Sequence, residues 1–144
     1  MRKLLSVILL VIMVSASLGA CTTNVSFGSS DVDPVGFSRS IDKETGKPVN
    51  KTSSFTQEDK IFYYVVKLNY VPAGTSIKSS FYFGKQHIAD AAPTVLDGPA
   101  KNTYYQCNLK LTNTVSPKGT YKVIVKGTKN GKTKFEITDT FKIK

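Results

Sequence analysis

The chain has 144 residues and a mass of 15.8 kDa, which is enough for one domain and too little for a multi-domain enzyme. Its residues are 40% hydrophobic, with two cysteines, one histidine and no tryptophan, and a domain of this size buries a core without needing disulfides or metals. Basic residues outnumber acidic ones by 20 to 10, so any function must accommodate a net charge of +10.

Residues 1–20 have the layout of a secretory signal peptide. The first three residues supply a short positive segment, and an almost unbroken apolar run follows from Leu4 to Ser17. This run is only marginally long for a transmembrane helix, which needs about 20 apolar residues. Its end is rich in small residues, which favours cleavage, so we expect residues 1–20 to be removed on export.

The end of this segment, Leu18-Gly19-Ala20-Cys21, resembles the lipobox of bacterial lipoproteins. The resemblance implies that Cys21 becomes the mature N-terminus and carries a thioether-linked diacylglycerol with chains such as palmitate. Two or three acyl chains anchor a protein stably, because each buried methylene contributes about 0.8 kcal/mol. Thr22 is not the Asp that signals inner-membrane retention, so the resemblance implies the outer membrane where the host has one, and otherwise the outer face of the cell membrane.

Residues 21–34 are interpreted as a lipidated tether ahead of a domain at 35–144. The tether is rich in small polar and turn-forming residues. Its last thirteen residues reach about 45 Å when extended and about 20 Å as a coil. Its two aspartates, Asp31 and Asp33, lack the further ligands of a calcium loop. With Cys21 acylated, Cys107 has no intrachain partner and is expected to be a small buried hydrophobe.

From Val35 onward, short runs of β-branched and aromatic residues alternate with turn residues, which predicts an all-β domain. The expected strands cover residues 61–68, 76–83, 95–96, 104–111, 120–126 and 134–143. The first of them lacks strict alternation, which predicts a central strand covered on most of both faces. The longer strands after it alternate, so their apolar parity should face the core. Asp139 interrupts the inward set of the last strand, which predicts a bulge or the rim of the sheet.

About seven short strands, turn signals every 8 to 12 residues and no internal repeat favour an immunoglobulin-like antiparallel β-sandwich. Residues 116–123, the hairpin after them and the Phe-x-Ile ending at residues 141–143 resemble the last two strands of Ig-like domains in many secreted bacterial proteins. The antibody hallmarks are absent, since there is no Trp and no Cys pair. The resemblance concerns the fold, because sandwiches host many unrelated functions.

Residue types that carry catalysis are sparse. His87 has no His partner and no second free Cys, so neither a metal site nor a cofactor is predicted. His87 is also the single candidate base for a serine hydrolase, and a loop position just after a turn indicates an exposed histidine instead. The adjacent pair Glu58 and Asp59 points to opposite sides of an extended strand, which does not suit glycoside hydrolysis. No phosphate-binding glycine loop occurs.

The charge is unevenly distributed along the chain. Without the signal peptide, 18 basic and 10 acidic residues remain; residues 21–100 hold eight of each sign, and residues 101–144 hold ten Lys against Glu136 and Asp139. Outward parity predicts one positive sheet face or edge, which is either a binding patch or a solvated edge that lysines guard against aggregation. Its residues are Lys110, Lys122, Lys126, Lys132, Lys134, Lys142 and Lys144. Tyr82 and Tyr104, of outward parity, are candidate recognition residues.

The sequence therefore predicts a lipid-anchored envelope lipoprotein whose sandwich is a non-catalytic binding module. Its expected partner is an envelope protein or an anionic envelope polymer, and nucleic acid is not expected in this compartment. A second interpretation is an inhibitor or accessory subunit of a secreted enzyme, acting through a sandwich-end loop such as Val71 to Thr75. An envelope hydrolase would require a pocket that gathers His87 with a nucleophile or paired acids. A purely structural spacer stays open as well.

Overall fold

The computed structural model describes residues 24–26 and 31–144, and this part of the chain forms eleven strands and no α-helix. The expected signal peptide and Cys21 lie outside the described residues. None of the described residues belongs to a helix able to cross a membrane.

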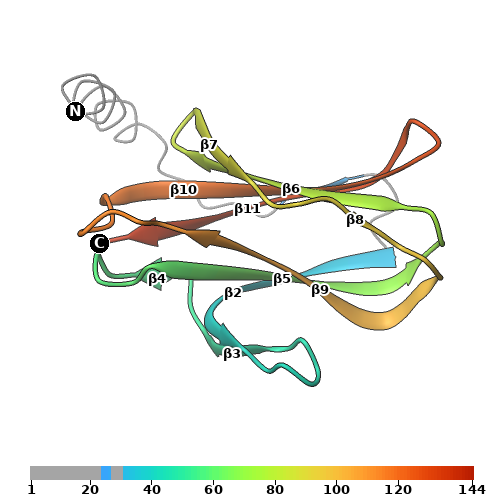
Figure 1. The fold of residues 1–144 in the computed structure, drawn as a ribbon, viewed down its shortest axis with the longest axis horizontal. Helices are drawn as coiled ribbons and strands as arrows, with labels where there is room; N and C mark the ends of the chain where they lie inside the picture. Colours follow the sequence, from blue (N-terminus) through green and yellow to red (C-terminus); the bar gives the residue numbers. More distant parts are fainter. Residues whose placement is uncertain (1–23, 27–30) are drawn as a thin grey trace.

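The strands form two sheets that pack face to face, which confirms the predicted β-sandwich (Figure 1). Sheet A has the order β1 (Asn24–Ser26), β11 (Lys132–Ile143), β10 (Gly119–Lys129), β6 (Ser76–Phe83) and β7 (Gln86–Asp90). Two short strands join it, β4 (Ser54–Phe55) on β11 and β8 (Thr94–Val95) on β6. Sheet B has the order β3 (Pro48–Lys51), β2 (Val32–Ile41), β5 (Ile61–Val71) and β9 (Ala100–Lys110). All neighbours are antiparallel except β4 and β11.

Sheet A extends into the segment that the sequence assigns to a tether. Residues Asn24 to Ser26 pair with the middle of β11, where Asn24 lies opposite Thr138. β2 starts at Val32, three residues ahead of the predicted domain boundary. Both ends of the predicted tether therefore contribute to the sheets. Short strands such as β1, β4 and β8 also explain why the described strands outnumber the seven expected from the sequence.

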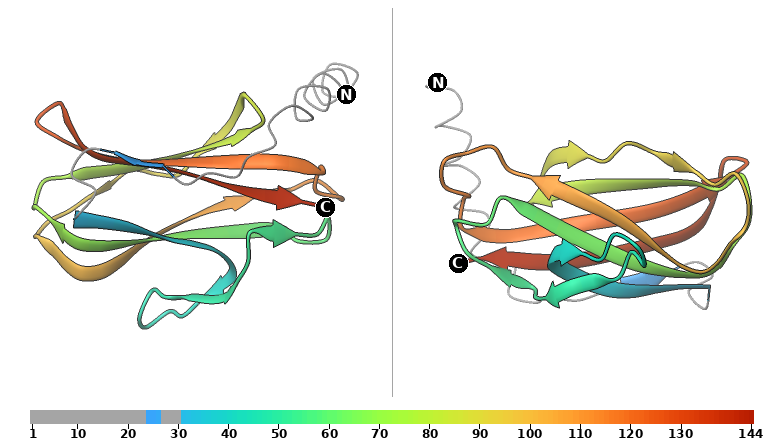
Figure 2. Two further views of the ribbon diagram at one scale, coloured as in Figure 1. Left: turned by 180° about the vertical axis from the view of Figure 1, so that it is seen from behind. Right: turned by 60° about the horizontal axis from the view of Figure 1, so that its bottom comes forward.

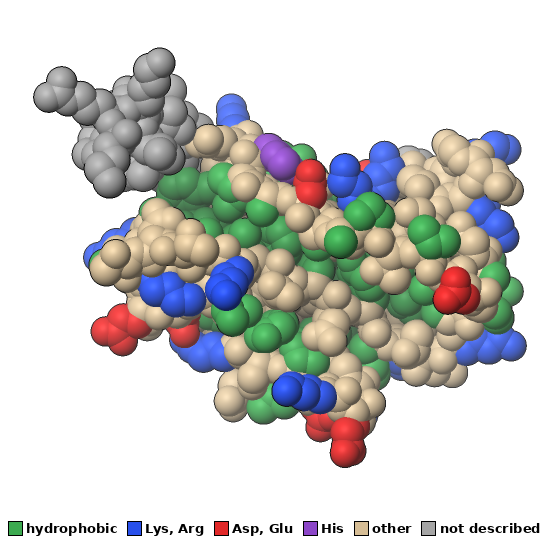
Figure 3. Space-filling view, in the orientation of Figure 1, with side chains coloured by type: hydrophobic (Ala, Val, Ile, Leu, Met, Phe, Trp, Pro, Cys, Tyr) green, Lys and Arg blue, Asp and Glu red, His purple; other side chains and the backbone are tan. Residues whose placement is uncertain are grey.

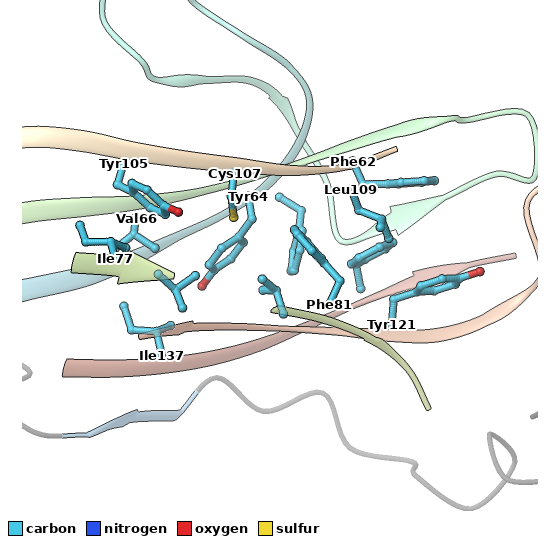
Figure 4. Packing of buried hydrophobic residues seen from close by; sticks show 14 of the residues in the cluster. Phe62, Tyr64, Val66, Ile77, Phe81, Tyr105, Cys107, Leu109, Tyr121 and Ile137 are labelled. Atoms are coloured by element: carbon cyan, nitrogen blue, oxygen red, sulfur yellow. The ribbon is translucent and has the colours of Figure 1, made fainter. Parts of the chain in front are cut away.

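The core is formed by the inward parity of both sheets, as the alternation predicts. The inward residues Tyr105, Cys107 and Leu109 of β9 are buried, and so are the corresponding residues of β6, β10 and β11. Figure 4 shows these side chains pointing from the two sheets into one interior. Phe141 lies in an aromatic cluster, with its ring centroid 4.8 Å from Phe37 and between 5.0 and 5.4 Å from Tyr121, Phe62 and Phe55. Ring pairs at such distances add stability beyond the area they bury.

The predicted central strand is confirmed as β5, between β2 and β9. Its outward-facing Val65 is nevertheless fully buried. The β2–β3 hairpin projects from the outer side of sheet B, away from sheet A (Figures 1 and 2). Gly46 at its turn lies against Tyr104 of β9, so the hairpin covers part of the outer side of sheet B.

The sequence predicts either a bulge or a position at the rim of the sheet for Asp139, and the structure has no bulge there. Asp139 stays in register opposite Val123, and the register shift lies instead at Gly127 and Thr128. Asp139 is half-buried and lines a hollow of about 270 Å³ where the sheets separate, so the alternative, a position at the rim, describes it. Burial raises the pKa of Tyr64 next to it, and the Asp139 carboxylate raises that pKa further.

Candidate binding face on sheet A

The outer face of sheet A carries its side chains in rows, because cross-strand partners of outward parity lie side by side. The first row joins Thr140, Lys122, Tyr82 and His87 across β11, β10, β6 and β7. The second row joins Thr138, Ile124, Ser80 and Asp90. The third row joins Glu136, Lys126 and Lys78, and the fourth pairs Thr128 with Ser76. We use the term lysine face for this surface.

A groove of about 460 Å³ crosses the lysine face. Its floor comes from β6 and β10, and Pro93, in the segment between β7 and β8, forms part of its wall. The lining residues are Ser76, Lys78, Ser80, Tyr82, Pro93, Ile124, Lys126, Thr128 and Glu136. Hydroxyl groups, two ammonium groups and one carboxylate thus surround a single apolar side chain on the floor. Such a lining suits a polar, charged ligand better than an apolar one.

Lys78 and Lys126 are the main electrostatic feature of the groove. They are direct cross-strand partners, and like charges in this position repel each other. Each ammonium has an acid nearby, since the Lys78 Nζ lies 4.0 Å from Asp90 Oδ2 and Lys126 is opposite Glu136. These groups are mostly exposed, so the acids offset the repulsion only weakly. An anion between the two lysines would relieve it.

Tyr82 lies at the end of the groove and is contacted by two side chains. The Lys122 Nζ lies over its ring, 4.7 Å from the centroid, and the His87 ring meets it edge-on at 5.4 Å. The His87 Nε2 in turn lies 2.9 Å from Asp90 Oδ1. Hydrogen bonding with His87, and secondly with Ser80, lowers the pKa of the Asp90 carboxyl. The Tyr82 ring thus packs between a lysine and a histidine on the lysine face.

The structure brings together some of the predicted binding residues and separates others. Lys122, Lys126 and Tyr82 share the lysine face, and Lys142 of β11, opposite Thr120, continues it. The register shift at Gly127 and Thr128 takes Lys132 and Lys134 off this face: Lys132 lies opposite Lys129, and Lys134 lines a hollow with Tyr70 and Val71 of sheet B. Lys110 lies on β9 in sheet B, so the prediction of one face for the seven lysines is wrong for this residue. Tyr104 also lies on β9, so it does not share a sheet with Tyr82. Lys144 follows the last strand.

Tyr104 is also less available than its parity predicts. Gly46 of the β2–β3 hairpin packs against its Cβ, and the Lys47 Nζ lies 5.9 Å from its ring centroid. Lys78, Ser76 and Glu136 line the groove, although they are not among the binding residues predicted from the sequence. Alternation along β6 puts Lys78 on the same side as Tyr82, so this pattern could have identified Lys78 as a candidate.

His87 and Cys107 are the histidine and the cysteine of the described residues that could take part in catalysis. The His87 ring contacts Asp90 and Tyr82, and Cys107 is buried, which raises the pKa of its thiol to about 12. Within residues 24–26 and 31–144, no group of three or more His, Cys, Asp or Glu side chains could hold a metal ion.

The loop from Val71 to Thr75, which the second interpretation assigns to insertion into an enzyme, is short, and hydrogen bonds tie it to Leu96 and within itself. Gly74 donates a backbone hydrogen bond to Leu96 O at 2.7 Å, and Leu96 donates one to Thr75 O at 3.0 Å. The Thr75 hydroxyl is buried and donates to Pro72 O at 2.8 Å.

No protein-family model matches this chain, and no curated protein sequence matches it.

Proposed function

We propose that the protein is an exported, lipid-anchored lipoprotein of the bacterial cell envelope and that its Ig-like β-sandwich is a non-catalytic module that binds anionic envelope groups. Residues 18–21 support the anchor through their resemblance to a lipobox. The lysine face supports the binding role, since four outward lysines lie on three adjacent strands against Glu136 and Asp90. Those lysines are Lys78, Lys122, Lys126 and Lys142.

The observation that carries the proposal is the cross-strand pair Lys78 and Lys126 in a groove lined with hydroxyls. A sheet face without a ligand gains nothing from two like charges side by side. A ligand with anionic groups gains from both lysines, and the hydroxyls of Ser76 and Thr128 lie beside them as hydrogen-bond donors. Each basic residue near an anionic surface contributes about 1 kcal/mol, and salt weakens this contribution.

The anchor is tested by feeding bacteria that express the full-length chain with an alkyne-tagged fatty acid. We expect the protein to be labelled, the Cys21→Ser variant to lose the label and the Cys107→Ser variant to keep it. The last variant is a matched control, because the chain has only these two cysteines. Equal labelling of the Cys21→Ser variant would contradict the lipid anchor.

The binding role is tested with the full-length protein in nonionic detergent and two soluble polyanions, polygalacturonate and polyphosphate. The double variant Lys78→Gln/Lys126→Gln should bind at least one of them about tenfold more weakly, and salt should weaken binding by the unmodified protein. The control variant Lys101→Gln/Lys110→Gln removes the same charge from β9 of sheet B. A similar loss in both variants would show that net charge acts and that the lysine face has no special role.

A further inference from the structure

The lipid anchor and sheet A are close together in the chain. β1 begins at Asn24, three residues after Cys21, and pairs with the middle of β11. Three residues span at most about 11 Å even when fully extended. The point of acylation therefore lies within that distance of the edge of sheet A, beside Thr138. The sandwich has too little free chain to stand away from the lipid surface.

Position relative to the anchor distinguishes the surfaces that can meet the bilayer. The lysine face begins at Thr138, next to β1, and crosses β10 and β6. The outer side of sheet B is also basic, since β9 carries Lys101 and Lys110 and the turn of the β2–β3 hairpin holds Lys43 and Lys47 beside Asp42 and Glu44, but it lies across the core from the lysine face. Basic side chains appear along the upper outline above sheet A and also in the lower half of the molecule around sheet B (Figure 3). A negatively charged membrane attracts both sides, and the short chain between Cys21 and β1 keeps the lysine face nearer to it.

We propose that the lysine face docks on the anionic headgroups of the membrane that holds the lipid anchor. This inference rests on the proposed function, because it requires acylated Cys21. A headgroup phosphate between Lys78 and Lys126 offsets their repulsion and accepts hydrogen bonds from the hydroxyls that line the groove. The anchor also holds the face at the membrane, so that contacts too weak for a free domain become effectively intramolecular.

Docking has a consequence for accessibility that binding of a dissolved polymer does not have. The lysines of sheet A become covered whenever the protein sits in an anionic bilayer, and those of sheet B stay open to solvent. Lys78 and Lys126 are exposed in the isolated chain, as are Lys101 and Lys110 on β9. The four side chains therefore form a matched comparison within one molecule.

The test uses the lipidated protein in vesicles of phosphatidylcholine alone or with about 30% phosphatidylglycerol, at about 0.01 M salt. Lysines are acetylated for a short time, and the modified sites are quantified by mass spectrometry. Intact mass first confirms the acyl chains on Cys21. We expect Lys78 and Lys126 to react at least about fivefold more slowly in the anionic vesicles. Lys101 and Lys110 should react equally in both, and about 1 M salt should remove the protection.

A double variant gives a second measurement that does not depend on the reactivity of Lys78 or Lys126. In Lys78→Gln/Lys126→Gln, the protection of Lys122 should fall, whereas Lys101→Gln/Lys110→Gln should preserve it. Equal reactivity of both sheets in anionic vesicles, or equal protection in phosphatidylcholine alone, would overturn docking on headgroups. Protection by dissolved polygalacturonate and not by anionic vesicles would overturn it while the binding function stands. An intact mass without acyl chains would refute the anchor and the docking together.

Discussion

Gly127 provides a sharp test of the packing between β10 and β11. It faces the core opposite Phe135, whose ring lies directly over it: a Cβ added at Gly127 would come within 2.3 Å of the nearest ring carbon. Phe135 is fully buried, so its ring has little room to move. Overpacking of this kind costs about 1–3 kcal/mol. An alanine also restricts the unfolded chain, which returns about 0.4–1 kcal/mol. Gly127→Ala should therefore lower the free energy of unfolding by about 1–2 kcal/mol.

The measurement is urea unfolding of the mature chain carrying Cys21→Ser, followed by circular dichroism because the protein has no tryptophan. Gly98→Ala is the matched control, since a Cβ there meets nothing within 4 Å, and it should be neutral or slightly stabilising. In Gly127→Ala/Phe135→Leu, the loss should be smaller than the sum of the single losses by about 0.5–3 kcal/mol, because the two residues share one contact. If Gly127→Ala matches Gly98→Ala, the close packing of Phe135 is refuted.

Three further predictions concern the core, the thiol and the pH dependence. Phe141→Ala should lower the free energy of unfolding by about 3–5 kcal/mol in urea titrations, because it removes the ring that four other aromatic residues contact; a loss below about 1 kcal/mol would contradict the cluster. In the Cys21→Ser chain at pH 8, Cys107 should react with an aromatic disulfide reagent only after unfolding, because burial raises its pKa to about 12. Burial opposes ionisation of Asp59, but the Thr56 N–H and Arg39 outweigh it and lower the Asp59 pKa. The ionised Asp59 therefore adds less than about 1 kcal/mol to the free energy of unfolding above the usual pKa of 3.8, and this contribution is lost as the pH falls below it. Asp59→Asn should flatten this part of the plot of unfolding free energy against pH, and an unchanged plot would contradict the ion pair.

Much of the local structure follows from alternation along the chain. Successive side chains of a strand point to opposite faces, so the apolar parity of residues 105–109, 121–125 and 135–137 predicted the core correctly. The same rule placed Tyr82 and Lys78 on one side of their strand. The turn residues around Asn130 and Gly131 also predicted the hairpin between β10 and β11, where both residues have positive φ.

The all-β class, the inward residues and the basic C-terminal third follow from the amino-acid sequence alone, because they depend on the strand period and on composition. Which strands are neighbours depends on the three-dimensional fold, since pairing rests on contacts between residues far apart in the chain. That pairing placed Lys110 on sheet B and brought Lys78 beside Lys126. It also folded a hairpin over Tyr104. Parity assigns a side chain to one side of its strand, whereas the packing of the sheets decides what shares that side.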